Sequence, residues 1–235
     1  MKAVGNCVIG MKRTNNEDAI YINEQKNLYL VADGMGGCNA GEVASSTAIS
    51  AFAEAMEQSK NEEILDKMME SIMICNRKVF QKSKQSIEFV DMGTTLVAAA
   101  MEKGKVFVVY VGDSRAYLYR QNDLKQITTD HSYVMELVKS GTITREEAEV
   151  HPKRNIITRA IGIREDVEAD VVIEDIKQGD KILLCTDGLS NMVSQNEIAT
   201  ILKQECSTEE KVKKLVLLAN QKGGLDNISL ILIEI

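Results

Sequence analysis

Short apolar runs recur along the chain at lengths typical of buried β-strands. The run at residues 28–32 ends in Asp33 and Gly34, and the run at residues 181–185 is followed by Thr186, Asp187 and Gly188. Runs of four to eight apolar residues bounded by turn residues predict strands. The predicted strands are residues 28–32, 95–101, 105–111, 115–120, 181–185 and 228–235.

Helical patterns lie between these runs. Residues 41–58 and 61–82 place apolar side chains at a spacing of three and four, with polar side chains opposite. Three later helix starts carry capping boxes, which pair a hydroxyl residue with a glutamate three positions on: Thr144 with Glu147, Ser194 with Glu197, and Ser207 with Glu210. The strands gather in sequence-local groups, which indicates an α+β fold rather than strict β–α–β alternation.

The composition predicts one soluble domain over residues 1–235. No Pro/Ser/Gly-rich linker divides the 235 residues, and 44% of them are hydrophobic, enough for a substantial core. The net charge of −7 argues against a broad nucleic-acid or acidic-membrane surface. No signal peptide or membrane-length apolar run is visible. An odd number of cysteines without a Cys-x-x-Cys pair predicts reduced thiols in the cytoplasm; they are Cys7, Cys38, Cys75, Cys185 and Cys206.

Histidine is scarce, and this limits the metal chemistry that the chain could support. His131 and His151 are the only two in the sequence, so a multi-histidine zinc or iron site is nearly excluded. We expect His131 to have a capping or structural role and His151 to be exposed. Any metal site must rely on carboxylates, carbonyls and water, which favour Mg²⁺ or Mn²⁺.

Four aspartates stand at the ends of predicted strands. Asp33 and Asp187 each precede a glycine, Asp113 follows residues 106–111, and Asp226 precedes the final strand. A lone Asp-Gly pair is usually a hairpin turn, but here a glycine-rich loop or a capped helix follows instead of a partner strand. Clustered carboxylates repel one another unless a cation neutralises them. The placement therefore predicts a two-metal site with a bridging aspartate, although a set of unrelated turns is the alternative.

A polar segment upstream adds one cation and two carboxylates, Arg13, Glu17 and Asp18. By composition alone a solvated loop is the favoured interpretation. In the functional interpretation, the planar guanidinium of Arg13 grips a phosphate group, while Glu17 and Asp18 hold metal-bound waters.

Taken together, these segments resemble the metal-dependent protein serine/threonine phosphatases, the PPM or type 2C family, in its compact bacterial form. Each segment is weak evidence alone, but all of them in this order are highly specific. The matching segments are residues 13–18 (Arg-x-x-Asn-Glu-Asp), 31–37 (Val-Ala-Asp-Gly-Met-Gly-Gly), 93–95 (Gly-Thr-Thr), 111–115 (Val-Gly-Asp-Ser-Arg), 185–188 (Cys-Thr-Asp-Gly) and 226–227 (Asp-Asn).

The resemblance implies a four-layer αββα sandwich, in which helices flank two central antiparallel sheets. It implies that Asp33 bridges two Mn²⁺ or Mg²⁺ ions and that the Gly34 carbonyl binds one of them. Asp187 and Asp226 would complete this site, with Asp113 as ligand of a third, weaker ion. Further implied roles are metal binding, directly or through waters, by Glu17 and Asp18, and phosphate binding by Arg13.

The implied reaction is direct attack on phosphorus by a metal-bridging hydroxide. Eukaryotic relatives carry a histidine after the first Asp-Gly as the proposed general acid, whereas this chain has Met35, which cannot donate a proton. A water on the third metal is the preferred donor. Residues 137–159 resemble the variable flap over the cleft, where Asn155 could add a ligand. The expected partners are phosphorylated proteins and a serine/threonine protein kinase, and the expected state is a monomer.

Two alternatives stay open. One is a phosphatase for a dedicated regulatory protein such as an anti-anti-sigma factor; such proteins usually carry an extra sensor region, for which this chain has no room. The other is a catalytically dead binding module of the same fold. That module would be expected to have lost a metal aspartate, and none is missing here.

Overall fold

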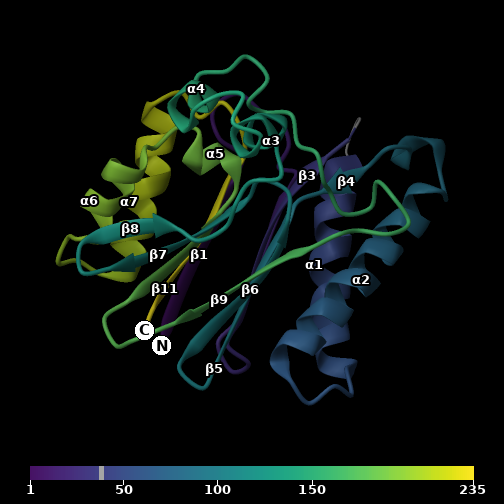
Figure 1. Cartoon of the computed structure of the whole chain (residues 1–235), viewed down its shortest axis with the longest axis horizontal. Helices are drawn as coiled ribbons and strands as arrows, with labels where there is room; N and C mark the ends of the chain where they lie inside the picture. The colour runs from purple at the N-terminus through teal and green to yellow at the C-terminus, as the bar shows by residue number, and fades with distance from the viewer. Residues whose placement is uncertain (37–39) are drawn as a thin grey trace.

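Two antiparallel sheets form the centre of the molecule. In the computed structural model, which describes residues 1–36 and 40–235, one sheet has five strands in the order β1-β11-β10-β7-β8. The other sheet has six, with the path β2-β3-β5-β6-β9 and β4 paired to β3 (Figure 1). The strands are β1 (Lys2–Val8), β2 (Asp18–Asn23), β3 (Leu28–Met35), β4 (Gly93–Thr94), β5 (Leu96–Glu102), β6 (Lys105–Val111), β7 (Arg115–Arg120), β8 (Asp123–Gln126), β9 (Asp170–Asp175), β10 (Lys181–Cys185) and β11 (Ile228–Glu234).

Helices cover the outer faces of the sheets. The long pair α1 and α2 packs on the second sheet, α6 and α7 pack on the first, and α3 and α4 lie at the end opposite the chain termini (Figure 1). This is the expected αββα sandwich. The helices are α1 (Ala40–Gln58), α2 (Ile64–Ser83), the 3₁₀ turn η1 (Ile87–Phe89), α3 (Tyr133–Lys139), α4 (Arg145–Glu149), α5 (Asp187–Ser190), α6 (Gln195–Leu202) and α7 (Thr208–Gln221).

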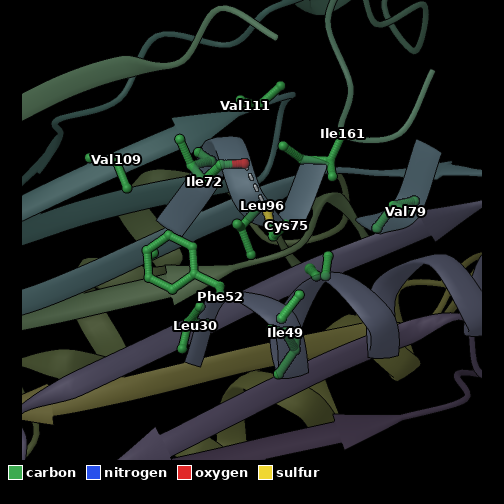
Figure 2. Close-up of a cluster of buried hydrophobic side chains, with 14 of the residues drawn as sticks. Leu30, Ile49, Phe52, Ile72, Cys75, Val79, Leu96, Val109, Val111 and Ile161 are labelled. Carbon is green, nitrogen blue, oxygen red and sulfur yellow. Dashed lines mark hydrogen bonds between the residues drawn. The ribbon is translucent and has the colours of Figure 1, made fainter. Parts of the chain in front are cut away.

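Strand β3 shows why the apolar runs are continuous. Leu28 and Leu30 point into the core beneath α1 and α2, whereas Tyr29 and Val31 point into the core between the two sheets. Both faces of the strand are buried, so successive residues are apolar instead of alternating with polar ones. Figure 2 shows the helix-side core, in which side chains from both helices meet those of the sheet.

The predicted elements are largely confirmed, and the three capping boxes start α4, α6 and α7. The pattern did not reveal β1, β2, β4, β8, β9, η1 or α5. In the described part of the chain, Cys7, Cys75, Cys185 and Cys206 are free thiols, and no helix is long and apolar enough to cross a membrane. Cys38 lies outside the described residues.

The helix-side core makes a direct stability prediction. Phe52 is fully buried in it (Figure 2), so Phe52→Ala should lower the free energy of unfolding by about 3–5 kcal/mol through lost transfer energy and a cavity. Leu217 on α7 is 57% exposed, and Leu217→Ala should change stability by about 0.5 kcal/mol or less. Urea unfolding measures both, and equal losses would contradict this assignment of the core.

Candidate active site

Strand pairing places two of the predicted carboxylates opposite each other. Asp18 begins β2 and is the register partner of Asp33 in β3, and opposed side chains of an antiparallel pair lie about 4.5–5.5 Å apart at Cβ. Asp18 is only 7% exposed. The solvated-loop interpretation of this segment is therefore wrong for Asp18, because pairing with β3 buries it.

Hydrogen bonds fix the two aspartates in place. The Thr186 hydroxyl donates to Asp18 Oδ2 over 3.0 Å. The backbone N–H of Asp33 donates to Thr95 Oγ1 at 3.0 Å, and the Asp33 carbonyl accepts from Thr94 Oγ1 at 2.8 Å. The backbone of Asp33 is thus held by Thr94 in β4 and by Thr95 between β4 and β5, without use of the Asp33 carboxylate.

The next two aspartates come from the same end of the antiparallel β10–β11 pair, where β10 ends and β11 begins. Asp187 is the first residue of α5 and accepts a hydrogen bond from Asn191 Nδ2 at Oδ2 (3.0 Å). Asp226 precedes β11 and pairs with Arg13, whose Nη2 lies 2.8 Å from Asp226 Oδ2. Arg13 is half-exposed, so it borders the carboxylate cluster from the solvent side.

Asp113 lies in the loop that joins β6 to β7. The loop is tied to the Asp33 backbone through Thr95, because Thr95 Oγ1 also lies 2.7 Å from the hydroxyl of Ser114. Asp113 adds its charge to the field at Asp33. The structure therefore brings all four strand-end aspartates and Asp18 into one cluster.

Gly34 stands where the backbone must approach closely. Its N–H donates to the Glu17 carbonyl at 3.0 Å, and a Cβ at this position would collide with the backbone oxygens of Glu17 and Gly41. Glu17 is in turn held by Asn227, whose Oδ1 accepts the Glu17 N–H at 2.8 Å. The Cδ of Glu17 would also lie against a Cβ on Gly41, so Glu17 reaches into the same region.

The electrostatics of the cluster are unfavourable for a set of bare anions. Burial raises the pKa of Asp33 well above its usual range, and the charges of Asp18, Asp187, Asp113 and Asp226 raise it further. Burial is also the main cause that raises the pKa of Asp18 and of Asp113 to about 7. The pKa of Asp187 is raised by burial and by Asp226.

The donor set fits hard divalent cations. Asp18 Oδ1 and Asp187 Oδ1 are buried without a hydrogen-bond partner in the described chain, as expected of oxygens whose partner is an ion. Among the described residues, no three His, Cys, Asp or Glu side chains form a ready-made group around one point. Such a group is not required, since Mg²⁺ keeps several waters and needs only one or two carboxylates.

A small cleft adjoins the carboxylates. Asp187, Gly188 and Asp226 line a cavity of about 80 Å³ together with Arg154 and Asn155 from the segment after α4. The C-terminal part of the segment 137–159 thus borders the carboxylates, and a role of Asn155 as a metal ligand stays a prediction. His151, expected to be exposed, is half-buried, and its ring lies against Tyr133 at 6.3 Å between centroids.

Met35 makes an apolar contact and has no proton to transfer. Its terminal methyl and the side chain of Ile163 both pack over Gly93. Gly37 of the glycine-rich motif, together with residues 38 and 39, lies outside the described residues.

Comparison with known families decides the assignment. The model of the family described as protein phosphatase 2C matches residues 11–222. The chain belongs to the protein phosphatase 2C family. A serine/threonine phosphatase stp of Listeria welshimeri is 40% identical over 232 residues, which cover 96% of this chain and 92% of the relative.

Solved structures of this family share the whole fold. The serine/threonine phosphatase of S. agalactiae superposes with a TM-score of 0.93 at 39% identity, covering 100% of this chain and 99% of that one. The catalytic domain of PstP in complex with two manganese ions superposes with a TM-score of 0.89 at 34% identity, covering 99% and 97%. The protein phosphatase 2C assignment therefore rests on both sequence and fold.

Sequence reasoning gave no role to the polar residues that orient the aspartates. Thr186 holds Asp18, Asn191 holds Asp187, and the Asn227 amide donates to the carbonyls of Ile9 and Asn15. A partial signal existed, since Thr186 and Asn227 each stand beside an aspartate of a family segment.

Proposed function

We propose that this chain hydrolyses phosphoserine and phosphothreonine esters of proteins at the carboxylate cluster. The observation that carries the proposal is the convergence of buried aspartates from distant strands, each raising the pKa of Asp33. A protein maintains such repulsion where a cation offsets it. The names of the similar proteins, serine/threonine phosphatases, support the same reaction.

The residues that would hold two Mn²⁺ or Mg²⁺ ions are Asp33, the Gly34 carbonyl, Asp187 and Asp226. When bound, such ions lower the pKa of water and neutralise charge that develops on a phosphoryl group. Asp33 is suited to serve both ions because Asp18 is its register partner and the charges of the other aspartates all act on its carboxyl group. Glu17 and Asp18 would hold ions directly or through waters, and Asp113 would hold a weaker third ion.

Arg13 is proposed to bind the phosphate of the substrate. Arg13 forms an ion pair with Asp226 through one of its guanidinium nitrogens, which leaves further N–H groups for phosphate oxygens. The pKa of Arg13 is raised, chiefly by the hydrogen bond to Asp226, so it stays charged at any working pH. Met35 has no proton to donate to the leaving oxygen.

The experiment is hydrolysis of a phosphothreonine peptide in the presence of Mn²⁺. We expect turnover that stops on chelation and falls about a thousandfold in Asp187→Asn, since loss of metal-based charge stabilisation costs several kcal/mol and each 1.36 kcal/mol is tenfold. Asp123→Asn, at an exposed position on β8, serves as the control. Activity that survives both chelation and Asp187→Asn would refute the proposal.

Substitution of Arg13 should affect mainly substrate binding. Arg13→Ala is expected to raise KM for a phosphopeptide about 10–100-fold, the value of one or two charge-assisted hydrogen bonds at about 1.5–3 kcal/mol. Arg13→Lys should recover part of this loss, because it restores the charge without the planar fork. Steady-state kinetics separates KM from kcat, and an unchanged KM in Arg13→Ala would place phosphate binding elsewhere.

We further propose that the physiological substrates are targets of a serine/threonine protein kinase, and that the protein is a cytoplasmic monomer of one domain over residues 1–235. Retention of every metal aspartate disfavours the catalytically dead module. A phosphoproteome compared with and without the protein identifies the substrates, and size-exclusion chromatography with light scattering measures its mass.

A further inference from the structure

His131 makes a reciprocal contact with the loop that carries Asp113. The N–H of His131 donates to the Gly112 carbonyl at 2.9 Å. The N–H of Gly112 donates back to Nδ1 of the His131 ring at 3.1 Å. Gly112 has a φ of 104°, which only glycine adopts readily, so this pair of hydrogen bonds fixes an unusual backbone immediately before Asp113.

The rest of the imidazole ring is buried and contacts Tyr110 and Asp170. His131 is 3% exposed, and its ring stacks on Tyr110 with 5.2 Å between centroids and 17° between planes. Nε2 lies 3.4 Å from Asp170 Oδ2, which is too long for a well-formed hydrogen bond, and Nε2 has no other partner in the described chain. Asp170 is also paired with Arg159 at 2.9 Å.

The backbone of His131 and its neighbours also contacts the C-terminal end of the flap segment. Its carbonyl accepts from the N–H of Thr158 at 2.8 Å. Ser132 forms a β-bridge with Ile157, and the N–H of Tyr133 donates to the Ile156 carbonyl. His131 therefore lies between two segments: the flap end that carries Asn155, and the loop that carries Asp113.

We propose that His131 is a positioning residue for Asp113: in the neutral form with its proton on Nε2, it holds Gly112 so that the Asp113 carboxylate is directed at the third ion. This inference rests on the proposed function. It assigns a specific task to a residue outside the ligand set. The tautomer follows from the geometry, because Nδ1 accepts a backbone N–H and so cannot itself carry the proton.

The environment favours the neutral ring. Burial lowers the pKa of His131, and the charges of Arg159 and Lys139 lower it further, while Asp170 acts in the opposite sense. A second proton on Nδ1 would also face the N–H of Gly112 at hydrogen-bond distance. Residues that support metal ligands from behind typically change metal affinity about 10–100-fold when they are replaced.

Two substitutions distinguish the roles of Nδ1 and Nε2 of His131. His131→Asn places an amide oxygen near the position of Nδ1 and can still accept from Gly112, whereas His131→Gln reaches toward Asp170 and leaves Gly112 without an acceptor. Asp113→Asn removes the proposed ligand itself and serves as the reference. Calorimetric titration with MnCl₂ measures the core ions and the weaker ion in the same experiment, and thermal unfolding monitors the fold.

We expect His131→Gln to weaken only the Asp113-dependent ion, by about tenfold or more, with His131→Asn within about threefold of the unmodified protein. Equal weakening in both variants, or none in either, would overturn the proposal, as would an Asp113→Asn protein that binds Mn²⁺ normally. Absence of the core ions in the unmodified protein would instead overturn the proposed function.

A measurement on the unmodified protein covers the case in which His131→Gln does not fold. Long-range ¹⁵N–¹H spectra report which imidazole nitrogen carries the proton. We expect protonated Nε2, unprotonated Nδ1 and a shift of the Gly112 amide signal when Mg²⁺ fills the weak site. A proton on Nδ1, or a Gly112 signal that does not respond, would overturn the proposal.

Discussion

Replacing Asp33 with asparagine is expected to abolish phosphopeptide hydrolysis and at the same time to make the metal-free protein more resistant to heat. The loss should be about a thousandfold or more, because the bridging carboxylate would serve both ions and each 1.36 kcal/mol of lost stabilisation costs a factor of ten. The gain in stability has a separate cause. Burial and four neighbouring aspartates raise the pKa of Asp33, and asparagine removes that repulsion.

The heat resistance is measured by thermal unfolding in EDTA at about pH 7.5. A relief of 1 kcal/mol corresponds to about 2–4 °C for a protein of this size, so we expect a rise of at least that order. Asp123→Asn at the exposed start of β8 should shift neither activity nor stability appreciably. An Asp33→Asn protein that is less stable than the unmodified protein in EDTA would show that the cluster is not a source of repulsion.

The second large effect concerns pH and metal together. The folded-state pKa of Asp18 and of Asp113 is about 7, raised from 3.8, and that of Asp33 is also raised. Between the unfolded value of 3.8 and these raised folded-state values, the folded state binds more protons than the unfolded state. The free energy of unfolding therefore falls as pH rises. In EDTA, the melting temperature should therefore decrease from about pH 6.5 to about pH 8.

The pH range of this prediction is chosen because other titratable groups change the stability of the protein at lower pH. His131 has a lowered pKa, so its neutral form contributes stability above the unfolded value of 6.5 that is lost at lower pH. Burial alone would raise the pKa of Asp180, but the hydrogen bonds from Arg120 outweigh it and lower the pKa below 3.8, so its stabilising contribution is complete above that value and is lost only at more acidic pH. Between about pH 6.5 and 8 the aspartate cluster dominates.

Adding Mn²⁺ should reverse this trend. Ions bind deprotonated carboxylates, so the increase in melting temperature on adding Mn²⁺ should be larger at pH 8 than at pH 6.5, with protons released on binding. Calorimetry in two buffers of different ionisation enthalpy counts those protons. A melting temperature in EDTA that rises with pH across this window would contradict the raised pKa values.

The sequence predicted the parts of the site that depend on local pattern. Asp33 and Asp187 were recognisable because an apolar run leads to each of them, and burial on both faces of a strand leaves that signal in the residues themselves. Asp18 was harder to assign. It lies in a polar stretch, and its burial depends on pairing with a strand that begins ten residues later.

The orienting residues were beyond the reach of local patterns. Thr186 holds Asp18 across 168 positions of sequence, and Asn227 holds Glu17 across 210. A threonine or asparagine beside an aspartate has no periodicity that indicates its distant partner. Strand β9 was missed for a related reason: its exposed Val171 and Ile173 mix with acidic residues at an edge of the sheet, so its pattern is neither clearly buried nor clearly alternating.

The position of β11 has a consequence for how the protein is made. Residues 228–234 do not form an edge of the first sheet but lie between β1 and β10, with Lys2 opposite Glu234. A growing chain on the ribosome therefore cannot close this sheet until residues 228–234 have been synthesised and have left the exit tunnel. Until then Arg13 lacks its partner Asp226, which directly precedes β11. Nascent or truncated chains that lack β11 would accordingly have no phosphatase activity.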